Sequence, residues 1–528
     1  MSSISTSHTE SLPARPAARQ GTRAGLLVWG AALALLLLGL ALRLYDLTDP
    51  PLDFHYTRQL RGAIIARGIY YGMLPEADPE RREDAVAWGR STGQYEPPIL
   101  ESLVALTYRL TGGENVWVGR IYSSLFWVVG GLALFGLARR LAAAHSASPA
   151  APLAALAALG YYLFLPFGVQ ASRSFQPDPG MTMWLVLAAY ALYRWMETAA
   201  SGQPAWRWAV LAGLLGGMAI LTKTVSIYIL AVGAAAGVLA VLGWRRALRS
   251  PQVWVMALTM SVPSLLFVIL GRGGSAVDYF QNWTLSLSRL LLDPGTYARW
   301  LNLVQDLMGL SILLLAVIGA LIARPRARAL LLGLLLGYVV YGLTLPYQMT
   351  THNYYHLQLI PLLAVALVPA AVPLLEKLWE QGPAARGTAL LALAGALAFS
   401  ALLSVNQMRV EDYRHEPPYW QEIGELLPRD GKVMALTPDY GYRLMFYGWR
   451  KVTLWPNRGE IKLSELRGKE KEFEQYFSKR TEGMGYFLVA TLRQFNEQAD
   501  LKAALTGGYP VYAEGDGYII FDLQHPLQ

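Results

Sequence analysis

The stretch AGLLVWGAALALLLLGLALRL, residues 24–44, decides the fold class of this chain. A helix that crosses a membrane needs about 20 predominantly apolar residues, and this run has that length, with Arg43 as its charged residue. A cleaved secretory signal is the alternative. However, the run is long, and it continues into Tyr45 and Asp46 without the pair of small residues that a cleavage site needs. We therefore expect an uncleaved anchor that follows a cytoplasmic tail, residues 1–23.

The composition of the whole chain agrees with a membrane protein. Of its 528 residues, 54% are hydrophobic and 16% are charged, whereas soluble domains carry roughly 25% charged residues. The absence of cysteine excludes disulfides, cysteine-ligated metals and a thiol nucleophile. The net charge of +8 is spread over short clusters between apolar runs. We therefore expect membrane lipids, and no nucleic acid, as partners.

Ten further apolar runs follow the anchor, which predicts about eleven transmembrane helices. Basic clusters fall in alternate loops between these runs, all on the side of the N-terminal tail. The positive-inside rule makes that side cytoplasmic, so an odd number of spans places residues 406–528 outside. The expected spans lie near 116–138, 151–168, 179–196, 206–221, 223–243, 252–270, 301–322, 329–345, 355–375 and 388–405.

The parts expected outside the membrane are two long loops, residues 45–115 and 271–300, and a C-terminal domain, residues 406–528. In the first loop, Arg58–Tyr71 and Ile99–Leu110 have helical periodicity but are too short to span, so we expect them along the membrane surface. The C-terminal domain mixes helix-like and strand-like segments, which predicts a soluble α/β fold. Its expected helices are 419–427, 463–477 and 494–505, and its expected strands are 432–437, 485–490, 511–512 and 518–522.

Charged residues at the outer ends of spans are candidates for a functional site, because ionisable groups at membrane depth are costly. The first cluster follows the anchor and holds Asp53, His55, Arg58 and Gln59. Within seven residues it offers a proton acceptor, an imidazole and a guanidinium that could bind phosphate. The alternative is a solvated loop in which Asp53 merely pairs with Arg58.

Two further clusters lie at other outer turns. Arg173 and Asp178 occupy a proline-flanked turn, where Asp178 could also simply cap the following helix. Lys223 stands between two apolar runs and either extends to the surface or meets an anionic headgroup.

A fourth cluster, His352-Asn353-Tyr354-Tyr355-His356, precedes a late span. The two histidines are four residues apart and would share a helix face, a spacing that suits a metal. No Glu completes an H-E-x-x-H motif, which argues against zinc catalysis. We leave a divalent metal open, with His55, His352 and His356 as candidate ligands. Tyrosines at this depth can also form an interfacial aromatic belt.

At these residues the chain resembles the polytopic GT-C glycosyltransferases of family 39, which include protein O-mannosyltransferases and the bacterial aminoarabinose transferase that acts on lipid A. Glu96 stands where the aminoarabinose branch has a lysine, and Phe54 stands where the mannosyltransferases have a second acid. The resemblance rests on the layout of residues 24–405 and on four motifs: Asp53 followed by Arg58, Arg173 with Gln176-Pro177-Asp178, Glu96-Pro97-Pro98, and His352-x-Tyr354-Tyr355 followed by Pro361.

The resemblance implies an all-α GT-C-like core and a transferase in the inner (plasma) membrane. This enzyme would move a sugar from a polyprenyl phosphate carrier to a lipid, glycan or protein hydroxyl at the outer face, with inversion. Asp53 would be the base and Asp178 would orient the acceptor or sugar. A lipid-linked sugar flippase and an inactive scaffold subunit remain alternatives. The candidate substrate-binding residues are Arg58, Gln59, Glu96, Arg173, Lys223, His352, Tyr354 and Tyr355.

Overall fold

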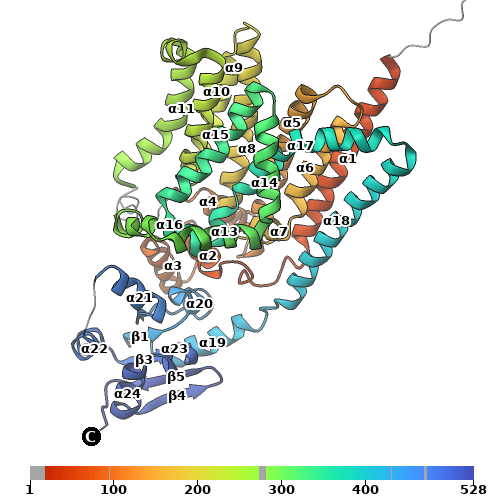
Figure 1. The fold of residues 1–528 in the computed structure, drawn as a ribbon. Coiled ribbons are helices and arrows are strands. Elements are labelled where there is room, and N and C mark those ends of the chain that lie inside the picture. The colour runs from red at the N-terminus through yellow and green to blue at the C-terminus, as the bar shows by residue number, and fades with distance from the viewer. Residues whose placement is uncertain (1–17, 94–95, 273–280, 430, 469–471, 528) are drawn as a thin grey trace, which may run out of the picture.

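The computed structural model describes residues 18–93, 96–272, 281–429, 431–468 and 472–527. It comprises a large helical bundle and a small domain with a sheet, which lies below one end of the bundle in Figure 1. The predicted fold class, an all-helical membrane core followed by an α/β domain, is confirmed. The anchor forms helix α1 (Ala18–Leu44), and most of the expected tail, residues 1–17, lies outside the described residues.

The chain is a multi-span membrane protein. In its described part, seven helices are long and apolar enough to cross a membrane, and nine are if each of two bent helix pairs forms one span. All the predicted spans overlap helices. After α1 these are α5 (Trp117–His145), α6 (Ala151–Phe164), α7 (Pro166–Arg173), α8 (Asp178–Ala200), α9 (Trp206–Thr222), α10 (Ser226–Arg249), α11 (Pro251–Phe267), α13 (Pro294–Met308), α14 (Leu310–Ile322), α15 (Pro325–Thr344), α17 (Leu359–Glu380) and α18 (Pro383–Val410).

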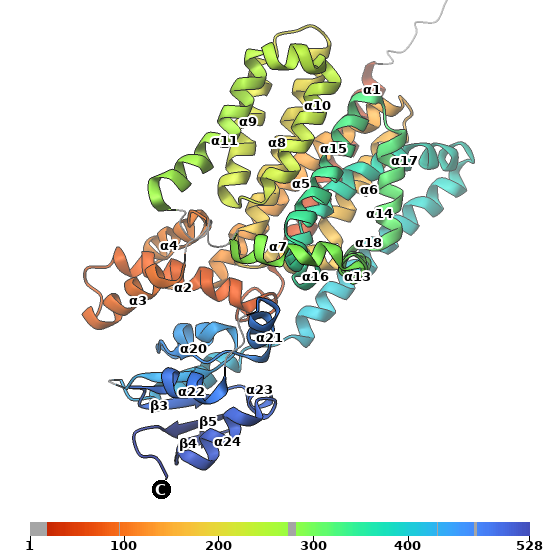
Figure 2. The same cartoon turned by 60° about the vertical axis from the view of Figure 1, so that its left-hand side comes forward.

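Two of the predicted spans are broken. Helices α6 and α7 meet at 58°, because Pro166 disfavours a helical conformation for Leu165 before it. Helices α13 and α14 meet at 92° at Gly309, whose φ of 84° is readily adopted by glycine. The span predicted over 301–322 is therefore made of parts of two helices. Helix α13 begins inside the expected loop and crosses the end of the bundle beside α16 (Pro346–Thr351) (Figure 2).

The two ends of the bundle differ in the loops that meet there. At one end, Arg140 and Arg194 both pair with Glu197, at 2.7 and 3.3 Å, and Arg324 donates to the carbonyl of Ala144. Arg140, Arg194 and Arg324 each belong to a different one of the basic clusters that the sequence predicts on the side of the N-terminal tail. At the other end lie the C-terminal domain and the helices of the first outer loop (Figure 1), so these two parts share a side, and its assignment to the outside remains a prediction. The first-loop helices are α2 (Tyr56–Gly72), α3 (Pro79–Ser91), which the sequence did not predict, and α4 (Ile99–Thr111).

The C-terminal domain has a five-stranded mixed sheet with the order β2-β1-β3-β5-β4. The expected helix over 463–477 is two helices, α21 and α22, and the expected helix over 494–505 is also two, α23 and α24. Strand β2 and helix α20 were not predicted. The strands are β1 (Val433–Leu436), β2 (Thr453–Leu454), β3 (Tyr486–Val489), β4 (Val511–Gly515) and β5 (Tyr518–Asp522); the helices are α19 (Glu416–Leu426), α20 (Tyr442–Tyr447), α21 (Arg458–Leu466), α22 (Phe473–Thr481), α23 (Leu492–Asn496) and α24 (Ala499–Gly508).

Helix α2 is held between the bundle and the C-terminal domain. Its Arg67 pairs with Glu114 at 2.9 Å and donates to the carbonyl of Phe446 on α20 at 2.6 Å. The same guanidinium lies over the rings of Phe446 and Trp449, at 3.8 and 4.4 Å. The segment predicted to lie along the membrane surface is therefore held in place by the C-terminal domain, on the side of α2 that faces away from the bundle.

Candidate active site

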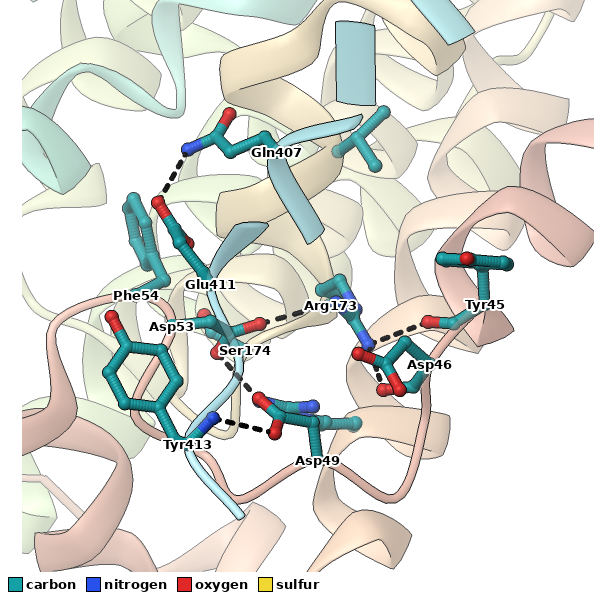
Figure 3. Close-up of polar contacts among 12 residues, drawn as sticks. Tyr45, Asp46, Asp49, Asp53, Phe54, Arg173, Ser174, Gln407, Glu411 and Tyr413 are labelled. Atoms are coloured by element: carbon teal, nitrogen blue, oxygen red, sulfur yellow. Dashed lines mark hydrogen bonds and ion pairs between the residues drawn. The ribbon is translucent and has the colours of Figure 1, made fainter. Parts of the chain in front are cut away.

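Asp53 lies in a buried ion-pair cluster with two arginines from the bundle. Its Oδ1 is 2.6 Å from Arg120 Nη2 and its Oδ2 is 3.2 Å from Arg173 Nη1. Arg173 also donates to the carbonyls of Tyr45 and Asp46, at 2.8 and 2.9 Å (Figure 3). Asp53 therefore does not form the pair with Arg58 that was the alternative to a functional site, and Arg173 has Asp53 as its carboxylate partner. Arg173 positions Asp53, and its Nη groups are already engaged in the described structure.

Gln59 connects the two acidic turns. Its amide nitrogen donates to Asp53 Oδ1 at 3.1 Å and to the carbonyl of Phe54 at 2.8 Å. Its amide oxygen accepts from the backbone N–H of Phe175 at 2.8 Å, three residues before Asp178. Because the side chain is fully buried, these bonds fix the first cluster against the second. Gln59 thus has a positioning role in place of the substrate contact that the resemblance implied.

Asp178 and Lys223 form a second buried pair. Lys223 Nζ donates to Asp178 Oδ1 at 2.6 Å, and both side chains are at most 3% exposed. The lysine therefore also has the carboxylate partner that the sequence did not predict. Its ammonium lies 4.9 Å from the ring centroids of both Tyr354 and Tyr355. The alternative that Asp178 caps helix α8 was wrong: the N-cap is Pro177, and Asp178 is the first helical residue. Its Oδ2 has no partner in the described structure.

Arg58 is the cation of the predicted set that carries no ion pair in the described structure. Its guanidinium lies 5.3 Å from the ring centroid of Tyr354, and its buried Nε has no hydrogen-bond partner. Glu96 makes no ion pair there either, but its charge acts on both Arg58 and Lys223. Arg58, Lys223 and Tyr354 thus form a cationic, aromatic centre, with Glu96 as an acidic neighbour.

The histidines divide between the site and the core. His55 has a left-handed backbone with φ of 45°, and its Nε2 lies 2.5 Å from Asn353 Oδ1. Burial lowers the pKa of His55, and burial together with the nearby charges of His55 and Arg58 lowers that of His352 to about 4. Both imidazoles are therefore neutral near pH 7.

The prediction that His352 and His356 share a helix face was wrong. His352 has an extended backbone, and residues 353–356 form a 3-10 turn. His356 is buried, with Nδ1 2.6 Å from the Tyr338 hydroxyl and Nε2 3.1 Å from the carbonyl of Met349. In the described residues no group of three or more His, Asp or Glu side chains could hold a metal. The structure thus assembles no metal site from His55, His352 and His356.

Two cavities open beside these charges. The first, of about 100 Å³, has mainly apolar walls from α2, α4, α5, α8 and α9, and includes Glu96 and the chain neighbours of Asp178 and Lys223, Pro177 and Thr222. The second, of about 620 Å³, has Asp53 and His55 in its wall. Asp53 therefore lies in the wall of the larger cavity, while Arg58 and Lys223 are not among the described lining residues of either cavity.

Sequence reasoning missed Arg120, which makes the shorter ion pair with Asp53. Its position near the start of an expected span, 116–138, was a usable signal, since an arginine in an apolar run marks a candidate site. It also missed Gln170 and Asp306 in the wall of the larger cavity. Neither belongs to a cluster of chemically suggestive residues in the sequence, and only the fold brings them to Asp53.

Comparison with known proteins confirms the resemblance to GT-C glycosyltransferases. Residues 95–269 match the family model described as dolichyl-phosphate-mannose-protein mannosyltransferase. No curated protein sequence matches the chain.

Solved structures of similar fold cover almost the whole chain. ArnT from Cupriavidus metallidurans, bound to undecaprenyl phosphate, superposes with a TM-score of 0.54 at 15% identity, over 95% of this chain and 98% of ArnT. The oligosaccharyltransferase AglB from Archaeoglobus fulgidus, in complex with an inhibitory peptide and a dolichol-phosphate, superposes with a TM-score of 0.57 at 13% identity, over 93% of this chain and 74% of AglB. At these identities the likeness shows a shared fold.

Proposed function

We propose that this protein is an inverting membrane glycosyltransferase that moves a sugar from a polyprenyl phosphate carrier to an acceptor hydroxyl at the outer face of the cytoplasmic membrane. The observation that carries the proposal is the convergence of Arg58 and Lys223 on the ring of Tyr354, at 5.3 and 4.9 Å. Chain neighbours of both cations line cavities: Thr222 and Arg61 line the apolar cavity, and His55 lines the polar one. The apolar cavity, of about 100 Å³, suits a single isoprene unit of the carrier, and the phosphate suits the two cations. The matched family and the lipid phosphates bound by ArnT and AglB support this class of donor.

In the proposed reaction, the acceptor oxygen attacks the anomeric carbon from the face opposite the phosphate. A new carbon–oxygen bond forms while the bond from that carbon to the phosphate oxygen breaks, and the electron pair leaves with the polyprenyl phosphate. Arg58 and Lys223 stabilise the negative charge that develops there. Asp53, in the wall of the polar cavity, accepts the proton of the acceptor hydroxyl.

Asp178 has a different part in this proposal. Its Oδ1 holds Lys223, while its Oδ2 has no partner in the described structure. That oxygen can accept a hydrogen bond from a hydroxyl of the transferred sugar. Asp178 thus orients the sugar and fixes the lysine at once.

The first test is binding of undecaprenyl phosphate to the full-length protein in lipid nanodiscs. Arg58→Gln should weaken binding about ten- to a hundredfold, since a charge-assisted hydrogen bond contributes roughly 1.5–3 kcal/mol. Arg109→Gln is the matched control, because Arg109 is about half exposed and its partner Glu76 is more than half exposed, 3.5 Å away. Equal affinity in both variants would place the phosphate elsewhere.

The second test is transfer. The parent protein, supplied with radiolabelled undecaprenyl phosphate-linked mannose, glucose or aminoarabinose and a cell-envelope extract, should label an acceptor from one of these donors. Movement of the lipid-linked sugar between leaflets without acceptor labelling would favour a flippase. Neither binding nor transfer would favour a scaffold.

A further inference from the structure

The 620 Å³ cavity beside Asp53 lies at the junction of several elements distant in sequence. Its walls come from the segment after α1, the break between α6 and α7, the bend between α13 and α14, the turn before α17, and the last part of α18. Neither arginine nor lysine is among its lining residues in the described structure. Its polar lining consists of Asp53, His55, Gln170, Asp306, Asn353 and Gln407.

Gln170 is the residue of this lining that the fold itself leaves unsatisfied. Its side chain is 3% exposed, and neither the amide nitrogen nor the amide oxygen has a hydrogen-bond partner in the described structure. Leaving buried polar groups unpaired is unfavourable. Both amide atoms are themselves buried, so a ligand in the cavity would pair with them once the side chain turns toward it. A carboxamide both donates and accepts hydrogen bonds, and a hydroxyl group can accept from its nitrogen or donate to its oxygen.

The charge of the cavity restricts that ligand further. The charge of Asp53 is balanced by Arg120 and Arg173, Asp306 is a second acid of the lining, and His55 is neutral near pH 7 because burial lowers its pKa. A phosphate or carboxylate would meet the acid Asp306, and no arginine or lysine is among the described lining residues to bind it. Sugar hydroxyls, by contrast, can donate to Asp306 and bond with Gln170.

The apolar part of the lining suits the same ligand. The rings of Phe54 and Phe167 lie 6.2 Å apart and both line the cavity. They offer apolar surface for the C–H faces of a sugar ring. The cavity thus combines hydroxyl-binding groups with aromatic surface.

We propose that this cavity is the acceptor site, and that it selects an uncharged, hydroxyl-rich glycan through Gln170 and Asp306; this rests on the transferase function proposed above. The acceptor hydroxyl lies next to Asp53, which accepts its proton, while Gln170 and Asp306 bind neighbouring hydroxyls. The site disfavours acceptors whose reacting sugar carries a phosphate.

The probes for a test are a diazirine-bearing alkyl glucoside and the same glucoside with a 6-phosphate, used with the full-length protein in phosphatidylcholine nanodiscs. After photolysis, mass spectrometry should find the neutral probe on peptides that line the cavity, at least tenfold more strongly than the phosphorylated probe. Gln170→Met should reduce labelling about tenfold and Asp306→Asn should reduce the preference for the neutral probe. Gln358→Met is the control, because Gln358 is also buried, with an unpartnered amide oxygen, but does not line the cavity.

Thermal unfolding separates a binding role from a structural one. Met fills nearly the volume of Gln and removes two unpaired polar groups, so Gln170→Met should unfold at the same or a higher temperature while it loses the probe. Loss of stability together with binding would overturn the proposal, as would equal labelling by the phosphorylated probe or undiminished labelling of Gln170→Met. Undecaprenyl phosphate binding is measured on the same samples. If the parent binds undecaprenyl phosphate but the labelling results are not obtained, the acceptor proposal alone is wrong. If the parent does not bind undecaprenyl phosphate, the donor assignment is wrong.

Discussion

Replacing Asp53 by Asn tests the proposed base, but the structure shows that this change alone has two effects. The side chains of Arg120 and Arg173 are 0% and 1% exposed, so the neutral amide would leave two buried guanidinium groups without their carboxylate. Breaking a buried ion pair by removing one partner costs about 3–5 kcal/mol. Loss of transfer in Asp53→Asn alone could then reflect unfolding.

A charge-balanced double variant separates the two effects. In Asp53→Asn with Arg120→Met, Arg173 keeps its bonds to the carbonyls of Tyr45 and Asp46, at 2.8 and 2.9 Å. The double variant should therefore recover most of the lost stability. If Asp53 is the base, its transfer rate should still be about 10²–10⁴ below the parent.

The assay combines thermal unfolding in nanodiscs with transfer from whichever undecaprenyl phosphate-linked sugar the parent uses. Arg120→Met alone is the control, since it keeps Asp53 paired with Arg173 at 3.2 Å. Its transfer rate should stay within about tenfold of the parent rate, a much smaller loss than the one expected on removing the base. Recovery of transfer together with stability in the double variant would refute the base assignment and leave Asp53 a structural role.

Two further predictions concern pH and packing. Because the pKa of His352 falls to about 4 in the folded protein, the unfolded chain binds more protons between about pH 6.5 and 4. The parent should therefore lose about 3 kcal/mol of stability on acidification that His352→Gln retains. A His525→Gln control, at an exposed site, should follow the parent, and equal pH slopes in all three proteins would contradict the prediction. A Cβ on Gly119 would lie 2.4 Å from the fully buried ring of Phe175, so Gly119→Ala should lower the free energy of unfolding by about 1–3 kcal/mol. Gly395→Ala is the control and should leave it unchanged, because no atom lies within 4 Å of its Cβ. Unchanged stability of Gly119→Ala would show that the ring can move freely.

Much of the helical core could be predicted from sequence because apolar length alone marks a span. That rule found a helix at every expected position, including α9, whose 17 residues are short for a crossing. It could not find the bend at Gly309, because the apolar run continues through the break. Helix α3 was missed since its capping signal, Asp78 before Pro79, lies in a polar stretch without apolar periodicity.

The site was predictable in its residue types but not in its pairings. The sequence predicted Asp53, Arg58, Asp178 and Lys223 at outer ends of spans, yet the one ion pair that it suggested for Asp53 was with Arg58, as an alternative. The actual partners, Arg120 and Arg173, are 67 and 120 residues away. Such pairings depend on which helices are neighbours, and apolar patterns do not encode that order.

The C-terminal domain, expected as a separate soluble unit, contacts the chain on both sides of Asp53. On one side, Arg414 pairs with Asp46. Beside it, the backbone N–H of Tyr413 donates to Asp49 at 3.0 Å, as Figure 3 shows. On the other, the Thr57 hydroxyl donates to Asp439 at 3.3 Å. Small displacements of a reacting group are costly in catalysis. These contacts therefore make the domain part of the scaffold that positions Asp53. Loss of its contacts with the first outer loop would displace Asp53 and so impair the proposed proton transfer.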